Sequence, residues 1–386
     1  MNLPGWIKKW FTPAKPLSEG LYHKNFGEGK NSNRVHLRMQ KNGTGILILN
    51  ASTVLQLNPS AAEYAFYFIK GEDPTYAAKL ISSRYRISRN QALNDYSEFV
   101  EKINQLINTT DLDPVSNLGF EPVQLHSAEL TAPLRLDCAL TYLLPPGTDP
   151  IDAPIKRVDR ELSTDEWKTI LDKAWTAGVP HIIFTGGEAT LRADLLELID
   201  HAEKNGQVSG LLTDGIKLVS QDYLETLLNT GLDHLMIILP AQHEPEWQSI
   251  KNAVEADIFL TVHLTVFETN INQAPQLLTR LKDTGVENIS LSLADRNLME
   301  KFVELRNLVA SLGFHLVSDL PVPYSAANPV AFETSEYSQH EGSGKTWLYI
   351  EPDGDVLPSQ GNPDIILGNL LRDEWEKIYP SHQTPS

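Results

Sequence analysis

The hydrophobic pattern of the chain changes twice along its length. In residues 34–57, apolar and polar positions alternate in three short runs separated by turn residues, VHLRMQ, TGILILN and TVLQL. Alternation with a period of two predicts strands, here of a small antiparallel sheet. Three segments with helical spacing follow, the first with Asn58 as its predicted N-cap, Pro59 at its first position and Gly71 as its stop. Together they predict a small winged-helix-like α+β domain over residues 20–110.

A different pattern occupies residues 133–318, after a polar stretch at 111–132 that we interpret as a linker. Six apolar runs alternate with helical segments at 163–177, 193–205, 219–229, 245–255, 271–283 and 297–311. This order predicts an α/β fold whose parallel strands are joined by right-handed crossovers. A doubly wound sheet and a partial (β/α)6 TIM-like barrel both satisfy the pattern. Both place a ligand at the carboxyl ends of the strands.

The charge of the chain limits its partners. The formal net charge is -18 and the pI is near 5.0, so the backbone of a nucleic acid would be repelled. No apolar run approaches the ~20 residues that span a bilayer, which favours a cytoplasmic protein. We interpret residues 1–19 as an N-terminal arm. Its aromatic and lysine residues, within 1–17, suit a membrane interface, but Pro13 leaves under two turns of helix, so docking of the arm on a protein surface is the preferred interpretation.

The candidate chemistry of the chain is sparse. Eleven histidines occur without any of the spacings typical of metal sites, so we predict no metal site. Cys138 is the only cysteine and alternates with leucines in LRLDCALTY, which predicts a buried core residue. In FLTVHLTV, Thr261, His263 and Thr265 alternate with apolar residues and are expected to face the interior of a barrel. Two interpretations of His263 stay open, a hydrogen-bonded structural residue and a ligand-binding or catalytic one.

The stretch HIIFTGGEATLRADLLELIDHAE resembles the radical S-adenosylmethionine (radical SAM) superfamily. In that family a partial six-strand barrel carries a Gly-Gly-Glu turn after its second strand, which matches Gly186, Gly187 and Glu188. The resemblance implies that this turn binds the amino group of S-adenosylmethionine. Glycines allow close approach of a ligand, and the carboxylate of Glu188 is a suitable acceptor for an ammonium group.

The resemblance also shows that this chain lacks the cluster cysteines of the family. The loop after the first strand of the family carries three cysteines that hold a 4Fe-4S cluster. Aligned on LTY, those positions hold Leu144, Thr148 and Ile151, and Ser359 replaces a cysteine of the C-terminal tail at residues 319–386, which is similar to SPASM-type extensions. We therefore predict that no iron–sulfur cluster is bound.

Three functional hypotheses follow from the intact turn and the missing cysteines. The first is a cluster-free pseudoenzyme that binds a peptide or a partner radical enzyme. The second is an enzyme that uses S-adenosylmethionine, or another small ligand, in the barrel without iron. In the third, the barrel is a scaffold only, and Glu188 caps backbone amides at a tight turn. We expect the first to hold, with no catalytic residue assigned.

The N-terminal domain suggests a peptide partner. The order of its elements, and phrases such as LQLNPSAAEY, resemble PqqD-like domains, which bind the leader peptides of ribosomally made, modified peptides. An extended peptide could add to a free edge of the sheet through backbone hydrogen bonds. The alternative is a domain that only braces the rest of the chain. The acidic charge of the protein favours a peptide with some positive charge.

Overall fold

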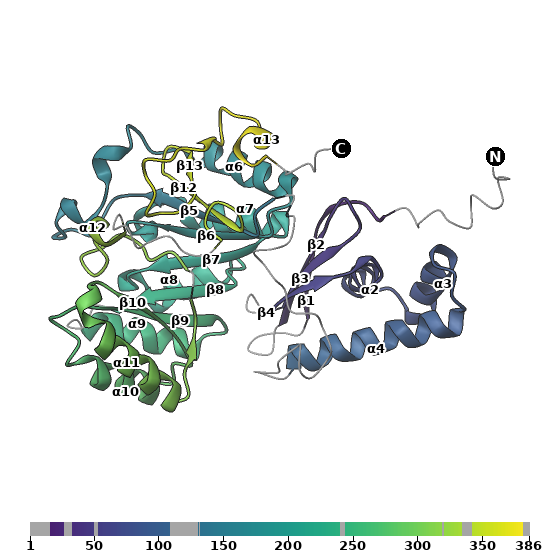
Figure 1. Ribbon diagram of the computed structural model, residues 1–386, viewed down its shortest axis with the longest axis horizontal. Helices are drawn as coiled ribbons and strands as arrows, with labels where there is room; N and C mark the ends of the chain where they lie inside the picture. Colours follow the sequence, from purple (N-terminus) through teal and green to yellow (C-terminus); the bar gives the residue numbers. More distant parts are fainter. Residues whose placement is uncertain are drawn as a thin grey trace. The chain divides into compact units, whose positions relative to one another are not determined.

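The structure is a computed structural model that describes residues 16–26, 33–49, 53–108, 130, 132–239, 244–318, 320–333 and 342–380. The described residues belong to two compact units, one up to residue 108 and one from residue 130 onward (Figure 1). Most of the predicted arm and most of the predicted linker lie outside the described residues. No helix in the described ranges is long and apolar enough to cross a membrane.

The N-terminal unit contains an antiparallel sheet of four strands in chain order, one more than the pattern predicted. The strands are β1 (Gly20–Phe26), β2 (Asn33–Met39), β3 (Gly45–Leu49) and β4 (Thr53–Leu57). The additional strand, β1, pairs along the whole of β2 and covers the edge that the three-strand prediction left open. The outer strands of the described sheet are therefore β1 and β4.

Three helices follow this sheet, α2 (Pro59–Lys70), α3 (Pro74–Arg84) and α4 (Arg89–Asn108). The predicted boundaries of α2 are confirmed, because the side chain of Asn58 accepts a hydrogen bond from the amide of Ala61 and Gly71 ends the helix in the left-handed region at φ 68°. Buried residues of β2, β3, β4 and α2 form one core with Phe99 and Ile103 of α4.

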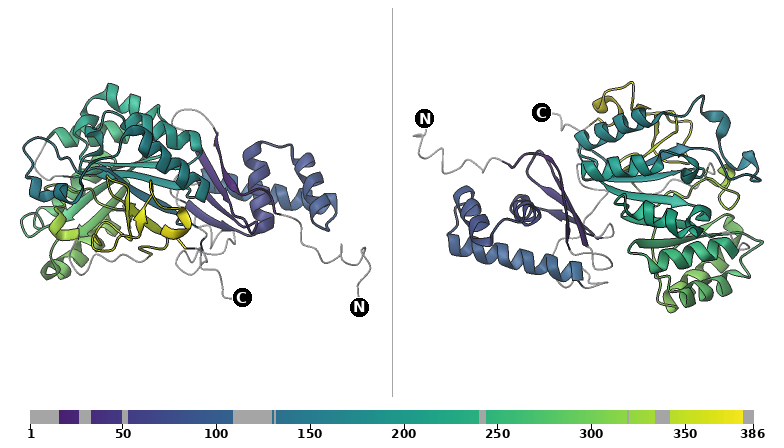
Figure 2. Two further views of the ribbon diagram at one scale, coloured as in Figure 1. Left: turned by 90° about the horizontal axis from the view of Figure 1, so that it is seen from above. Right: turned by 180° about the vertical axis from the view of Figure 1, so that it is seen from behind.

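The second unit is an α/β fold with a mixed sheet of ten strands, in the order β11-β10-β9-β8-β7-β6-β5-β12-β13-β14. Figure 1 labels β5 to β10, β12 and β13 of this sheet, and Figure 2 shows the unit from two further sides. Strands β5 to β12 pair in parallel along this order, and β13 and β14 pair antiparallel at one end. The strands are β5 (Arg135–Thr141), β6 (His181–Gly186), β7 (Val208–Thr213), β8 (His234–Ile238), β9 (Phe259–Val266), β10 (Asn288–Leu293), β11 (His315–Leu316), β12 (Trp347–Ile350), β13 (Asp355–Leu357) and β14 (Gly368–Asn369).

The helices between the strands agree with the predicted alternation to within a few residues. They are α6 (Thr164–Ala177), α7 (Leu195–Asn205), α8 (Gln221–Leu228), α9 (Glu244–Glu255), α10 (Ala274–Thr284) and α11 (Met299–Ser311), with the short α12 (Val330–Glu333) and α13 (Trp375–Ile378) near the C-terminus. Short 3-10 turns lie at Pro150–Asp152, Ile155–Arg157, Ala189–Leu191, Ile216–Val219 and Arg296–Leu298.

The two faces of this sheet differ in what covers them. Residues of α6 to α11 join alternate strand residues, such as Leu136, Phe184 and Val262, in a single large core. The opposite face, called the inner face below, carries a separate apolar cluster, in which Ile183 and Met236 pack with Val322 from the segment after β11. Because the helices share one core on one face, the doubly wound alternative does not apply.

Candidate functional site

The Gly-Gly-Glu turn packs against the loop that follows β5. The amide of Gly187 donates to the carbonyl of Thr141 (2.7 Å), and the amide of Glu188 donates to the carbonyl of Leu143 (2.8 Å). Gly186 has a φ of 133°, and a Cβ atom there would lie 2.1 Å from the Thr141 oxygen. A Cβ on Gly187 would lie 2.3 Å from the Leu143 oxygen. Both glycines are therefore required by contact between two segments of the chain itself.

The polar groups of the turn are also used within the protein. The Glu188 side chain is buried, and its carboxylate accepts hydrogen bonds from the amides of Thr190 (2.9 Å) and Asp214 (2.7 Å) and from the hydroxyl of Thr213 (2.7 Å). The carbonyl of Gly186 accepts from the amide of Tyr324 (2.8 Å). Such contacts satisfy a buried carboxylate without an external ammonium group. They are the contacts that the scaffold hypothesis assigned to Glu188.

The residues at the positions of the family's cluster cysteines do not fit an iron–sulfur cluster. Leu144, Thr148 and Ile151 offer no thiolate, and Ile151 is 74% exposed. Cys138 lies fully buried in β5 within the helix-side core, as predicted, and burial raises the pKa of its thiol. In the part of the chain that the structure describes, no group of three His, Cys, Asp or Glu residues is placed to hold a metal ion.

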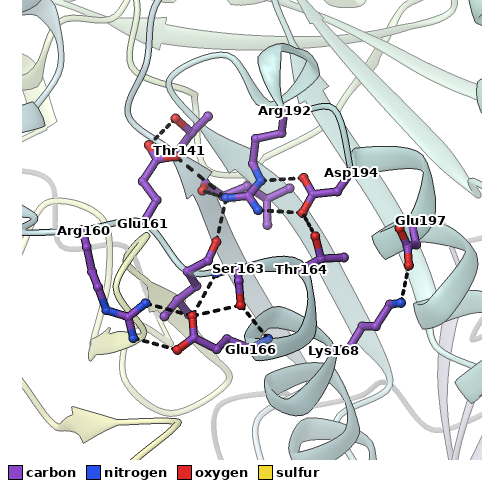
Figure 3. Close-up of polar contacts among 12 residues, drawn as sticks. Thr141, Arg160, Glu161, Ser163, Thr164, Glu166, Lys168, Arg192, Asp194 and Glu197 are labelled. Carbon is purple, nitrogen blue, oxygen red and sulfur yellow. Dashed lines mark hydrogen bonds and ion pairs between the residues drawn. The ribbon is translucent and has the colours of Figure 1, made fainter.

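Arg192 holds one side of the loop that follows β5 in place through hydrogen bonds (Figure 3). Its guanidinium donates to the carbonyls of Leu140 and Leu162, both at 3.1 Å, and makes a two-pronged pair with Asp194 at 2.8 and 2.7 Å. Next to it, the hydroxyl of Thr141 donates to Glu161. The arginine thus ties the end of β5 to the segment that leads into α6.

A buried polar network holds the other side of the loop. The Tyr142 hydroxyl donates to Glu351 (2.9 Å) and lies 3.1 Å from the guanidinium of Arg157, which also pairs with Glu351. The rings of Tyr142 and Tyr324 meet edge to face at 5.6 Å. Burial raises the pKa of Glu351, while Arg157 and Tyr142 oppose that shift. Side chains from the C-terminal segment thus anchor the loop.

The inner face of the sheet contains a cavity of about 560 Å³, called the inner cavity below. His263 and Thr265 of β9 line it, whereas Thr261 is buried and does not line it. Gly186, Gly187 and Glu188 are not among its lining residues either. The structure therefore separates the predicted site residues into the turn and the cavity.

His263 lies at the centre of a hydroxyl cluster. Its Nδ1 is 3.0 Å from the Ser290 hydroxyl, and its Nε2 is 3.2 Å from the hydroxyl of Thr265 and 3.1 Å from that of Ser292. Burial lowers the pKa of His263 to about 3, so the imidazole is neutral near pH 7. Because the ring is neutral and both of its nitrogens contact hydroxyls, His263 acts in the cavity as an uncharged hydrogen-bonding group.

For several residues, the sequence analysis did not predict that they line the inner cavity. Ser290 and Ser292 alternate with apolar residues in NISLSL, the same signal that marked His263 on the neighbouring strand. Ser359 and Gln360 come from the loop after β13, and Arg135 and Asp137 from β5. No local pattern connects those last four positions to β9.

Comparison with known proteins gives matches in both sequence and structure. Residues 146–245 match the radical SAM superfamily. The PqqA peptide cyclase of Bradyrhizobium diazoefficiens is 27% identical over 261 residues, covering 60% of this chain and 68% of that protein. The PqqA peptide cyclase of Rhodopseudomonas palustris is 28% identical over 261 residues, covering 60% of this chain and 65% of that protein. This chain thus spans about two thirds of the length of each relative.

The fold is similar to that of Streptococcus suis SuiB. The SuiB structure bound to its precursor peptide SuiA has a TM-score of 0.54 at 13% identity, covering 94% of this chain and 88% of SuiB. The structure bound to S-adenosylmethionine has a TM-score of 0.52 at 14% identity, covering 84% of this chain and 81% of SuiB. At this level of identity the likeness concerns the fold.

These comparisons correct one expectation. The first functional hypothesis, a non-catalytic pseudoenzyme, is contradicted because the relatives are named as peptide cyclases, which are catalysts. The second hypothesis, an enzyme, agrees better with them. Residues 146–245 are thus similar to the radical SAM superfamily, in a chain that is similar to PqqA peptide cyclases.

Proposed function

We propose that this chain is a peptide-modifying enzyme that uses S-adenosylmethionine, or another small ligand, in the inner cavity without an iron–sulfur cluster. The observation that carries the proposal is the inner cavity of about 560 Å³, lined by polar side chains on β9 and β10, in a chain whose cluster positions hold no thiolate. A cavity with a few placed polar groups is typical of a small-ligand site. The relatives named as peptide cyclases support a peptide as the substrate.

The proposal includes the finer architecture. We infer that β5 to β10 form a partial (β/α)6 barrel around the inner cavity, and that residues from 319 onward are a SPASM-like extension without cluster ligands. Ser359 and Gln360, which line the cavity, belong to that extension. We further infer that residues 20–110 are a PqqD-like domain that binds the leader of the substrate peptide.

Turnover by iron-free protein tests the proposed activity. Protein purified with a chelator is incubated with S-adenosylmethionine and with precursor peptides encoded near its gene, and the peptides are analysed by mass spectrometry. We expect a mass change that depends on the protein and survives further chelation. The proposal fails if no peptide in the set changes mass, or if a change appears only after reconstitution with iron and sulfide.

Matched substitutions locate the activity in the inner cavity. Ala294 lines the cavity, so Ala294→Phe narrows it and is expected to lower turnover about 100-fold or more, because small displacements of bound groups cost that much. Ala310 lies exposed on α11, so Ala310→Phe makes the same chemical change away from the cavity and should leave turnover unchanged. Equal effects of the two substitutions would count against this location.

Hydrogen–deuterium exchange on the full chain tests the peptide partner. An extended leader that adds to the N-terminal sheet would pair with an outer strand, β1 or β4, because outer strands present unpaired backbone groups. We expect slower exchange in residues 20–26 or 53–57 when a substrate precursor is added. Slower exchange confined to other segments, with binding demonstrated by calorimetry, would contradict leader binding at this sheet.

A further inference from the structure

The hydroxyl cluster around His263 presents acceptors to the inner cavity. A neutral imidazole has one N–H, and Thr265, Ser290 and Ser292 have one O–H each. The imidazole contacts all three hydroxyls, and Ser292 and Thr265 also lie 3.2 Å from each other. In either tautomer of the ring, these contacts direct three of the four protons at members of the cluster and leave one hydroxyl proton over. Each hydroxyl oxygen has two lone pairs, so most of the capacity left over is that of acceptors.

Gln360 adds an acceptor from a distant segment. Its side-chain nitrogen donates to the carbonyl of Val322 at 2.8 Å, which fixes the orientation of the amide. The residue is only 5% exposed, and its Oε1 atom is buried with no hydrogen-bond partner in the described part of the chain. Buried carbonyl groups are nearly always paired, so this oxygen, which lies beside a cavity, is available to accept a hydrogen bond from a bound ligand.

The charges that line the inner cavity favour a cation. Arg135 and Asp137 neutralise each other in a two-pronged pair at 2.7 and 3.0 Å. Among the described lining residues, the other charged side chains are those of Asp295 and Glu333, which are negative, and of Arg296, which is positive. The net charge of -18 acts in the same direction by attracting cations to the protein.

The apolar part of the lining suits a long side chain. Leu320 and Val322 offer aliphatic surface, and Phe302 and Phe332 offer aromatic rings. Basic side chains bury their methylene stems along such surfaces, and a cation is attracted to an aromatic face. Trp347, which also lines the cavity, already carries the guanidinium of Arg135 at 5.0 Å from its ring centre.

We propose that the inner cavity receives the basic side chain of a lysine or arginine of the substrate peptide, with Gln360 Oε1 and the hydroxyl cluster as its acceptors. This inference rests on the proposed function and deepens it, because it names the class of side chain that the site selects. Ammonium and guanidinium groups are donors only, so they complement a wall that offers acceptors.

Four small probes test this inference by binding alone. They are the Nα-acetyl methylamides of lysine, arginine, norleucine and glutamate, titrated into the full chain by calorimetry or ligand-observed NMR. We expect the lysine or the arginine probe to bind at least tenfold more tightly than norleucine, which has no charge, and glutamate to bind weakest. Equal binding of norleucine, preference for glutamate, or no binding of either basic probe would overturn the proposal.

Two variants connect the binding to the named acceptor. Gln360→Leu removes the unpaired oxygen at similar volume and should weaken the basic probes about tenfold to a hundredfold, since the lost bond is to a charged donor. Gln248→Leu makes the same change at an exposed position of α9 and should leave binding unchanged. Unchanged affinity in Gln360→Leu would contradict the assignment.

A third variant covers the case in which Gln360→Leu does not fold. Arg296 lies exposed at the lining, so Arg296→Gln removes a positive charge and should tighten the basic probes several-fold while leaving norleucine unchanged. Weaker binding of the basic probes in Arg296→Gln would overturn the proposal.

The two proposals fail in different ways. Turnover of peptides that lack lysine and arginine would refute the inference and leave the proposed function standing. Tight binding of the basic probes without turnover of any peptide would refute the proposed function and leave the inference standing.

Discussion

Acidification from pH 7 to pH 5 is expected to lower the free energy of unfolding of the second unit by roughly 4 kcal/mol through two buried histidines. Burial lowers the pKa of His263 to about 3 and that of His234 to about 4, and both residues are almost fully inaccessible. A histidine in the unfolded chain has a pKa near 6.5, so between pH 6.5 and 4 the unfolded chain binds protons at these two positions and the folded chain does not. The stability that the two neutral histidines contribute is fully present above pH 6.5 and is lost as the pH falls toward 4 and 3, the pKa values of the folded state.

The contacts of each histidine explain why its neutral form is kept. His263 is surrounded by three hydroxyls. The Nε2 of His234 lies 2.7 Å from the Nε2 of His181, so one ring must donate and the other accept, and two protonated rings would repel each other. Each histidine accounts for roughly 2 kcal/mol of the stability lost at pH 5, because each pH unit below 6.5 lowers the free energy of unfolding by about 1.4 kcal/mol.

Urea unfolding at pH 7, 6 and 5, followed by tryptophan fluorescence, measures this loss. His263→Asn keeps a hydrogen-bonding side chain but does not titrate, so it should reduce the slope of stability against pH by about 1.4 kcal/mol per unit below pH 6.5. His315→Asn makes the same chemical change at an exposed position and serves as the control for the substitution. An unaltered slope in His263→Asn would contradict the prediction.

Local signals allowed much of the fold to be predicted. The caps of α2 at Asn58 and Gly71 are features of neighbouring residues, and the structure confirms them. The alternation in β9 likewise placed His263 and Thr265 on the face of the sheet opposite the helices, where both line the inner cavity. Such features depend on residues a few positions apart, so the sequence carries them directly.

Strand β1 was missed because its local pattern is poor. The polar run His23, Lys24 and Asn25 interrupts its apolar residues. The strand is held instead by distant rings, since Tyr22 meets Phe66 at 5.0 Å and Phe26 meets Phe68 at 4.9 Å. Tertiary contacts of this kind override weak local propensity.

The sequence did not reveal the polar groups that join the C-terminal segment to the sheet. Tyr142 and Glu351 are 209 positions apart, and Gln360 reaches back to Val322. The Gly-Gly-Glu motif also gave an incomplete view, because a motif names residue types and not the contacts that satisfy them. The hydrogen bonds of Glu188 became visible only with Thr190, Thr213 and Asp214 in place.

Loss of the Arg157 side chain is expected to destabilise the second unit strongly. The pair between Arg157 and Glu351 is largely buried, with side-chain exposures of 21% and 4%. Arg157→Ala would leave the Glu351 carboxylate with the Tyr142 hydroxyl as its remaining partner in the network described above. Breaking a buried pair costs 3–5 kcal/mol, and the partial exposure of Arg157 reduces this to about 2–4 kcal/mol in the free energy of unfolding.

An exposed arginine in the same loop region provides the matched control. Arg160 pairs with Glu166 at 2.8 and 2.7 Å, but its side chain is 58% exposed. Exposed pairs contribute little because water and salt screen them, so Arg160→Ala should shift the urea midpoint far less than Arg157→Ala. Comparable shifts for the two variants would show that the buried network does not anchor the loop.

A double substitution separates two quantities: the net stability that the Arg157–Glu351 pair contributes, and the stability lost when one partner is left buried alone. In Arg157→Met with Glu351→Leu, no buried charge is left alone, so we expect much of the lost stability to return. Turnover need not return with it, because the loop would then pack against apolar side chains in place of the hydrogen bonds that Arg157 makes with Tyr142 and Glu351. Stability restored together with full turnover would mean that the network serves only the fold, whereas stability restored without turnover would make Arg157 a positioning residue for the inner cavity.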